Sequence, residues 1–182
     1  MLEVIAVVSG IVAVFLATRE HVATWPVGLL SVGLYVFIFF DAQLYSDVIL
    51  HVFYVGMQLY GWWTWLRGGA GHGHLAITHL ARRPLLLWVA ATLVGSALWG
   101  WAMASWTDAA LPWADAFTTT ASFAAQYLMA RKYMQHWAFW FIINLVAVGV
   151  YVDRGLWLTA GLYGVYWVLS VVGYRTWQAR MA

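Results

Sequence analysis

Seven apolar segments, separated by short polar connections, constrain the fold of this chain more than any other feature. They cover approximately residues 2–18, 25–40, 44–66, 84–104, 112–130, 136–152 and 156–178. Each is close to the roughly 20 residues that a helix needs to cross a bilayer. Hydrophobic residues make up 64% of the chain and charged residues only 9%, whereas soluble domains carry about 25% charged residues. The sequence therefore predicts an all-α integral membrane protein with seven transmembrane helices.

The basic residues predict the orientation of these helices. If successive segments alternate in direction, eight of the nine Lys and Arg residues fall on one side: Arg19, Arg67, Arg82, Arg83, Arg131, Lys132, Arg175 and Arg180. The positive-inside rule then places the N-terminus outside and the C-terminus in the cytoplasm. The first segment contains Glu3 and lacks a basic leader, so we expect a mature span rather than a signal peptide.

An internal repeat is the second strong pattern. A shift of 112 residues aligns the first three segments with the last three without a gap, placing Arg19 on Arg131, Trp25 on Trp137 and Asp41 on Asp153. The halves lie four segments apart, so they are predicted to be parallel repeats joined by one linking helix. We expect a single domain, 1–182, in a 3+1+3 arrangement. Repeat one covers about 2–66, the linking helix about 84–104 and repeat two about 112–178. Transporters with such repeats bind substrate between them, near mid-membrane.

A candidate site lies in the sixth segment, in the spacing W-x-x-W-x-x-x-N. Trp137, Trp140 and Asn144 share one helical face. Burying an unpaired amide at membrane depth is costly, and indole rings with an amide are suited to binding a flat, polar, cationic ring. Alternatively, Trp137 anchors the helix at the membrane interface and Asn144 hydrogen-bonds a neighbouring helix.

Other polar or aromatic residues at membrane depth extend this candidate site. Segment three carries His51, Tyr54 and Gln58 at the same i, i+3, i+7 spacing, and their equivalents in the last segment are Tyr163, Tyr166 and Ser170. Gln126 lies in segment five. We take His51, Tyr54, Gln58, Gln126 and Tyr163 as further candidate substrate contacts. For both glutamines the alternative is helix–helix hydrogen bonding, and for His51 it is packing or a proton relay.

The sequence lacks the motifs of several other functional classes. It contains no Cys, and no nucleophile–base pair or phosphate-binding glycine loop is present, so we expect no enzyme activity and no cofactor. His72, His74 and His79 lie in a long, flexible, Gly-rich connection without carboxylates, so we predict no metal site there. Nothing indicates nucleic-acid binding.

Two segments carry a family resemblance. WPVGLLSVGLYVFIFFDAQLYSDVILHVFYVGMQLYGWWTW and DAFTTTASFAAQYLMARKYMQHWAFWFIINLVAVGVY resemble the PnuC family of bacterial vitamin transporters. The resemblance covers nearly the whole chain outside 67–84. It implies a SWEET-like architecture, a homotrimer in the bacterial inner membrane, and a substrate motif at Trp137, Trp140 and Asn144. It also implies uptake of nicotinamide riboside by facilitated diffusion, with trapping by a cytoplasmic kinase.

The sequence is also compatible with other functions. The same fold carrying thiamine is the runner-up, since thiamine is also a flat aromatic cation, and family relatives carry riboflavin or deoxynucleosides. A membrane scaffold or receptor without transport would use the aromatic and amide residues for packing only. A proton-coupled symporter would depend on His51, the single mid-segment residue that titrates near neutrality.

Overall fold

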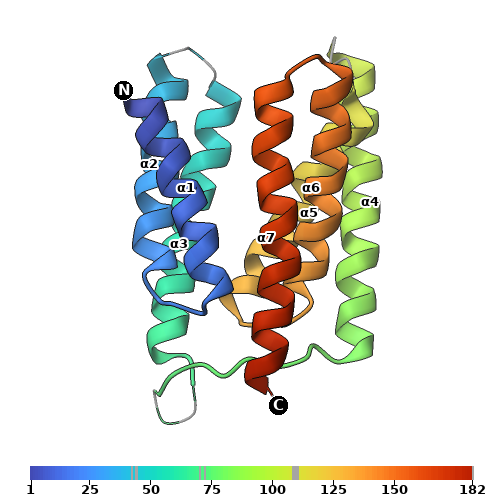
Figure 1. Ribbon diagram of the computed structural model, residues 1–182. Helices are drawn as coiled ribbons and strands as arrows, with labels where there is room; N and C mark the ends of the chain where they lie inside the picture. Colours follow the sequence, from blue (N-terminus) through green and yellow to red (C-terminus); the bar gives the residue numbers. More distant parts are fainter. Residues whose placement is uncertain (42, 44, 70, 72, 108–110, 182) are drawn as a thin grey trace. The chain divides into compact units, whose positions relative to one another are not determined.

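A computed structural model describes residues 1–41, 43, 45–69, 71, 73–107 and 111–181 of the chain. His72 of the Gly-rich connection and Leu44, the first residue of the third predicted segment, lie outside the described residues. Within the described part, seven helices follow one another (Figure 1): α1 Leu2–Thr18, α2 Thr24–Asp41, α3 Tyr45–Arg67, α4 Arg82–Trp106, α5 Pro112–Ala130, α6 His136–Asp153 and α7 Trp157–Met181. Each of the seven predicted segments is thus confirmed as a helix, with ends within three residues of the prediction.

Four of these helices meet the requirements for crossing a membrane on their own. α2, α4, α6 and α7 are each at least 18 residues long and sufficiently apolar, and α1 is a shorter apolar helix. Many of their large apolar side chains are exposed, including Phe37, Leu87, Leu98 and Leu158. Because water disfavours such surfaces and lipid does not, a multi-pass membrane protein is the consistent interpretation.

The chain divides into two compact units. Unit 1 comprises Met1–Ile77 with two short segments, Ala130–Lys132 and Arg175–Ala182, and unit 2 comprises Thr78–Met129 and Tyr133–Tyr174. Unit 1 therefore contains α1 to α3, whereas unit 2 contains α4, α6 and most of α5 and α7. Each unit is described by itself.

In unit 1, small side chains allow α1 and α2 to approach closely. Ala6 and Ala13 of α1 are buried, and their carbonyl oxygens accept hydrogen bonds across the helix pair. Ser31 Oγ donates to the Ala6 oxygen and Thr24 Oγ1 to the Ala13 oxygen, both at 2.8 Å. α3 packs on the other side of α2 (Figure 1). Small residues with hydrogen-bonding hydroxyls are a common means of joining helices in lipid, where no hydrophobic effect drives association.

In unit 2, α5 presents a similar surface of small residues. Ala116, Ala121, Ala124 and Ala125 are all buried, and Ala121 and Ala125 form a core cluster with Ile143 of α6. On α4, Ser96 Oγ lies 2.6 Å from Thr120 Oγ1 of α5. The interior of this unit is therefore built from alanines and hydroxyl groups, so large polar side chains stand out within it.

The turns after equivalent helices have the same geometry. The His21 N–H donates to the Leu16 carbonyl at 3.0 Å after α1, and the Tyr133 N–H donates to the Leu128 carbonyl at 2.9 Å after α5. These bonds close C-terminal caps of the Schellman type. The residue in the left-handed region is Glu20, with φ of 56°, in the first turn and Lys132, with φ of 52°, in the second. A displacement of 112 residues relates each of these features to its counterpart.

The end of the long connection before α4 is bonded to unit 2, which the expectation of a flexible segment did not anticipate. The Met134 N–H donates to the Thr78 carbonyl at 2.9 Å. The carboxamide of Gln135 accepts from the Leu80 N–H at 2.9 Å and donates to the Leu80 carbonyl at 3.0 Å. The Gln135 carboxamide thus makes the two hydrogen bonds to Leu80 that a neighbouring β-strand would make. These bonds hold the segment against the α5–α6 turn.

Candidate functional site

Asn144 lies inside unit 2 and bonds α6 to α7. Its side chain is 4% exposed, and Nδ2 donates to Ser170 Oγ at 3.3 Å. Ser170 Oγ in turn donates to the Tyr166 carbonyl at 2.9 Å. Among the described residues no hydrogen bond reaches the Asn144 carbonyl oxygen. The amide therefore serves as a helix–helix link and still has an acceptor available for a ligand.

Trp140 lies one turn before Asn144 and packs against the alanine surface of α5. It contacts the cluster of Ala121, Ala125 and Ile143 while remaining only partly buried. Gln126 follows Ala125 and is 7% exposed. Within the described part of the chain no hydrogen bond involves its amide. Because a buried carboxamide is costly without partners, Gln126 is a candidate for hydrogen-bonding a ligand.

Trp137 has a different environment from Trp140. It is 2% exposed, and its ring lies against Gly173 of α7 so closely that a Cβ on this glycine would overlap the indole. Its equivalent, Trp25 of α2, is fully buried and lies against Gly61 of α3 in the same way. This contact occurs in both halves of the chain, so it belongs to the packing of the helix pairs. A substrate contact of Trp137 stays a prediction.

His51, Tyr54 and Tyr163 also belong to aromatic clusters that occur twice. In unit 1, the His51 ring lies 4.8 Å from Phe39 and 5.8 Å from Tyr54. In unit 2, Tyr163 lies 5.1 Å from Tyr151 and 5.9 Å from Tyr166. The edge-on pairs of the two clusters have interplanar angles of 85° and 89°. Such pairs stabilise helix contacts by about 0.5–1.5 kcal/mol beyond their area, and a substrate contact of these rings stays a prediction.

Gln58 of α3 reaches toward the backbone of α2. Its side chain is partly buried, and its carboxamide lies against Gly28. No hydrogen bond joins this amide to another of the described residues. Gln58 thus contacts Gly28 of α2, whereas His51 and Tyr54 of the same helix belong to the aromatic cluster.

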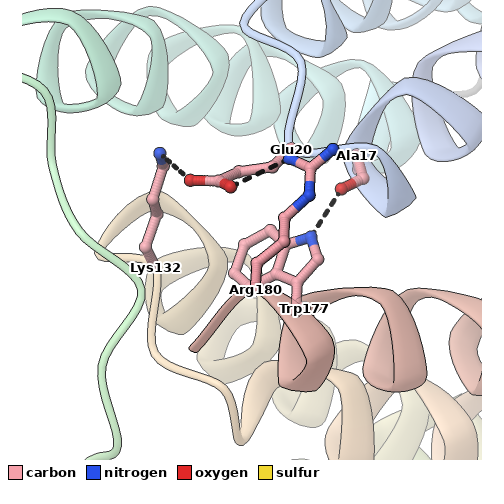
Figure 2. A network of polar contacts seen from close by, with 5 residues as sticks. All are labelled: Ala17, Glu20, Lys132, Trp177 and Arg180. Carbon is pink, nitrogen blue, oxygen red and sulfur yellow. Dashed lines mark hydrogen bonds and ion pairs between the residues drawn. The ribbon is translucent and has the colours of Figure 1, made fainter. Parts of the chain in front are cut away.

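A charged cluster in unit 1 was not predicted as a site. Glu20 Oε1 lies 2.6 Å from Lys132 Nζ, and Glu20 Oε2 lies 3.0 Å from Arg180 Nη1 (Figure 2). The Lys132 side chain is 6% exposed and that of Arg180 is 44% exposed. Lys132 Nζ also lies 4.5 Å from the ring centroid of Trp65. Sequence analysis used Lys132 only to orient the helices, although the repeat alignment places it on Glu20 with opposite charge.

The same cluster includes a hydrogen bond between the ends of the chain. Trp177 Nε1 donates to the Ala17 carbonyl at 2.8 Å (Figure 2). This oxygen belongs to the last turn of α1 and also accepts from the Glu20 N–H at 2.9 Å. The indole of α7 thus adds a second hydrogen bond to the carbonyl that helps to close the α1 cap. Glu20 and Trp177 together bind the α1–α2 turn to the last turns of the chain.

The His-rich connection does not assemble a metal site in the described residues. No group of three or more His, Asp or Glu side chains there is placed to hold an ion. His74 and His79 are both exposed, and His72 lies outside the described residues.

Comparison with known proteins places the chain in a family. The model of the family described as "Nicotinamide mononucleotide transporter" matches residues 1–179. The nicotinamide riboside transporter PnuC of Neisseria mucosa is 30% identical over 191 residues, which cover 95% of this chain and 70% of that protein. The riboflavin/roseoflavin transporter RibM of Streptomyces davaonensis is 27% identical over 185 residues, covering 98% of this chain and 84% of the relative.

A solved structure agrees with these relatives. The crystal structure of the vitamin B3 transporter PnuC matches with a TM-score of 0.75 and 28% sequence identity, covering 98% of this chain and 80% of that one. The family match therefore covers almost the whole length of the chain, including α5 and α6, which carry the amide residues Gln126 and Asn144. The chain belongs to the nicotinamide mononucleotide transporter family, the family of the PnuC transporters.

Proposed function

We propose that this protein carries nicotinamide riboside across the membrane. The observation that supports this most directly is the pairing of a partly exposed indole, Trp140, with carboxamides that have open hydrogen-bonding capacity, Gln126 and Asn144. The indole face attracts a flat cation, and the amides supply the donors and acceptors that a carboxamide or a ribose requires. Trp137 supports α6 through its contact with Gly173, and His51, Tyr54 and Tyr163 support the helix pairs.

The charge distribution favours the riboside over the mononucleotide named in the family description. A phosphate requires Lys, Arg or oriented backbone N–H groups. All nine Lys and Arg residues of this chain lie in the connections or toward the helix ends, and among the described residues none of them bonds to Gln126, Trp140 or Asn144. An uncharged ribose 5′-hydroxyl suits these surroundings, so nicotinamide mononucleotide is expected to bind far more weakly.

We further propose that the helices form a 3+1+3 arrangement of parallel repeats with all seven crossing the membrane. The bounds of α2, displaced by 112 residues, reproduce those of α6, and the start of α3 likewise reproduces that of α7. The basic residues then place the C-terminus in the cytoplasm. A homotrimer in the bacterial inner membrane follows from the family resemblance. A C-terminal reporter active only in the periplasm would contradict the orientation.

Transport is proposed to be passive, with accumulation driven by phosphorylation inside the cell. Every Asp and Glu of the sequence lies within four residues of a helix end or in a connection, so no carboxylate is available at mid-membrane for proton or sodium coupling. Liposomes containing the protein alone should equilibrate labelled nicotinamide riboside without concentrating it. Concentrative uptake driven by an imposed proton or sodium gradient would contradict this mechanism.

Riboflavin is the second candidate substrate, because the relative RibM is a riboflavin transporter. Thiamine remains a candidate on charge alone. Calorimetric titration of the purified protein with nicotinamide riboside, nicotinamide mononucleotide, thiamine and riboflavin separates these possibilities. We expect saturable binding of nicotinamide riboside, and tighter binding of any other compound would replace the proposed substrate. Binding without uptake in liposomes would indicate a receptor.

Two substitutions connect the binding to the proposed residues. Asn144→Val introduces the residue found at the equivalent position of α2, Val32, and is expected to weaken binding about tenfold or more, because a hydrogen bond to the ligand is lost. Trp140→Ala removes the stacking surface and is expected to cost about 0.5–2 kcal/mol of binding free energy. Trp157→Phe, at an exposed position of α7, is the control and should leave affinity unchanged.

A further inference from the structure

Gly28 of α2 and Gln58 of α3 form a close contact within unit 1. A Cβ placed on Gly28 would lie 2.5 Å from Gln58 Nε2, 3.0 Å from Cδ and 3.2 Å from Oε1. All three atoms are members of the carboxamide, so the amide group occupies the space that a side chain at position 28 would take. The absence of a side chain at Gly28 thus determines where the amide of Gln58 lies.

Gly28 differs from two other glycines of the same helix pair. A Cβ added to Gly33 of α2 or to Gly56 of α3 would meet no atom within 4 Å. A glycine inside a helix is less favourable than alanine, and at position 28 it accompanies a specific close approach. Gly33 and Gly56 provide matched controls, because alanine at either position changes the helix without touching Gln58.

The equivalent positions of unit 2 carry the opposite distribution of side chains. Gly28 corresponds to Trp140 and Gln58 corresponds to Ser170. In unit 1 the long side chain therefore comes from α3 and the glycine from α2, whereas in unit 2 the large side chain comes from α6 and the small one from α7. Trp140 is the proposed stacking residue, so the carboxamide of Gln58 occupies the level of the helix pair that corresponds to the proposed binding level of unit 2.

The amide of Gln58 is also available to a ligand. Its side chain is partly buried in an apolar helix pair, and in the described part of the chain no hydrogen bond involves it. A carboxamide in such surroundings is destabilising unless another polar molecule bonds to it. Its contact with Gly28 restricts its orientation before the ligand arrives, which reduces the entropy lost on binding.

We propose that Gly28 is a positioning residue for substrate specificity: it holds the carboxamide of Gln58 in the orientation that hydrogen-bonds the carried nucleoside. This inference rests on the proposed transport of nicotinamide riboside. The ligand group concerned is one with both a donor and an acceptor, such as a carboxamide or a ribose hydroxyl.

The test is a double-mutant cycle measured by calorimetric titration of nicotinamide riboside. Gly28→Ala displaces the amide, and Gln58→Met removes its hydrogen-bonding groups while keeping an unbranched side chain of similar length. Each is expected to weaken binding about tenfold. The double variant should bind no more weakly than Gln58→Met alone, because Gly28 acts only through the amide. Gly33→Ala and Gly56→Ala should bind as the wild type does.

Each outcome has a distinct meaning. If the wild-type protein does not bind nicotinamide riboside, the proposed function fails. If the wild type binds and Gly28→Ala binds equally well, the positioning role is overturned. Additive losses in the double variant would also overturn it, because Gly28 would then act independently of Gln58. If Gly28→Ala does not fold, Gln58→Met decides, since it leaves α2 unchanged and wild-type affinity in that variant contradicts the proposal.

Discussion

Trp25 in α2 and Trp137 in α6 occupy equivalent positions, and each ring packs on a glycine of the next helix, Gly61 or Gly173. One turn further along, the helices differ, with Gly28 in α2 and Trp140 in α6. A contact present in both halves serves a requirement that both share, which is the packing of one helix on the next. A contact present in only one half serves a requirement specific to that half. Comparison of the two halves thus distinguishes packing residues from candidate binding residues, and it requires no sequence of a related protein.

The largest effect should come from the charged pair that distinguishes the two equivalent turns. Glu20→Gln leaves Lys132 buried without its carboxylate, and breaking a buried pair typically costs about 3–5 kcal/mol. Arg180→Ala removes an exposed partner of the same carboxylate and should cost about 0–1 kcal/mol. Thermal or denaturant unfolding in detergent measures both. If Glu20→Gln and Arg180→Ala cost equal stability, the burial of Lys132 does not determine the strength of its ion pair with Glu20.

A double variant sharpens this result. Replacing both Glu20 and Lys132 by Gln removes the buried charge together with its partner, so stability should recover much of what Glu20→Gln loses. A double variant as unstable as the sum of the single ones would indicate that the two side chains act separately.

An intermediate effect is expected at the shared glycines. Gly61→Ala and Gly173→Ala each force a Cβ into a buried indole, and overpacking of this kind costs about 1–3 kcal/mol. Because both contacts belong to packing, the two variants should lose similar stability, while the folded fraction keeps its affinity for nicotinamide riboside. Gly56→Ala and Gly164→Ala, whose Cβ atoms would meet nothing within 4 Å, are the controls. A selective loss of affinity in Gly173→Ala would assign Trp137 to the binding site.

The smallest effect is expected from His51→Tyr. This change introduces the aromatic residue that stands at the equivalent position, Tyr163, into a cluster of the same geometry. Stability and affinity should change little, by about 0.5 kcal/mol or less, as for other substitutions that preserve packing. Uptake should also keep its dependence on pH. Abolished transport with intact binding would instead assign His51 to proton movement.

Helix positions were predictable because the contrast between apolar segments and charged connections is strong in a membrane protein. The ends of α1 and α5 agree with the prediction to the residue. The repeat alignment also pairs turns that share their geometry in the structure, as the left-handed conformations of Gln43 and Gly155 illustrate. These features depend on local sequence, which explains why sequence alone suffices for them.

Side-chain partners were less predictable, because they depend on how closely two backbones approach. The sequence patterns gave Gly28 no role, whereas in the structure its missing side chain leaves space for the amide of Gln58. Trp137 and Trp140 have the same residue type and lie on one helical face, yet a glycine on α7 buries the first. The hydrogen bond from Asn144 to Ser170 likewise depends on the spacing of α6 and α7.

The contact between Glu20 and Lys132 has a consequence for how a duplicated chain can assemble. Residues 20 and 132 are the same position of the repeated unit, and in the folded chain they touch. In a complex of two identical three-helix chains, the same contact would join a residue to its own copy, and either Glu or Lys would face a like charge. Fusion into one chain allows the two copies to diverge to opposite charges. The pair thereby favours the union of unlike halves and disfavours the self-association of either half.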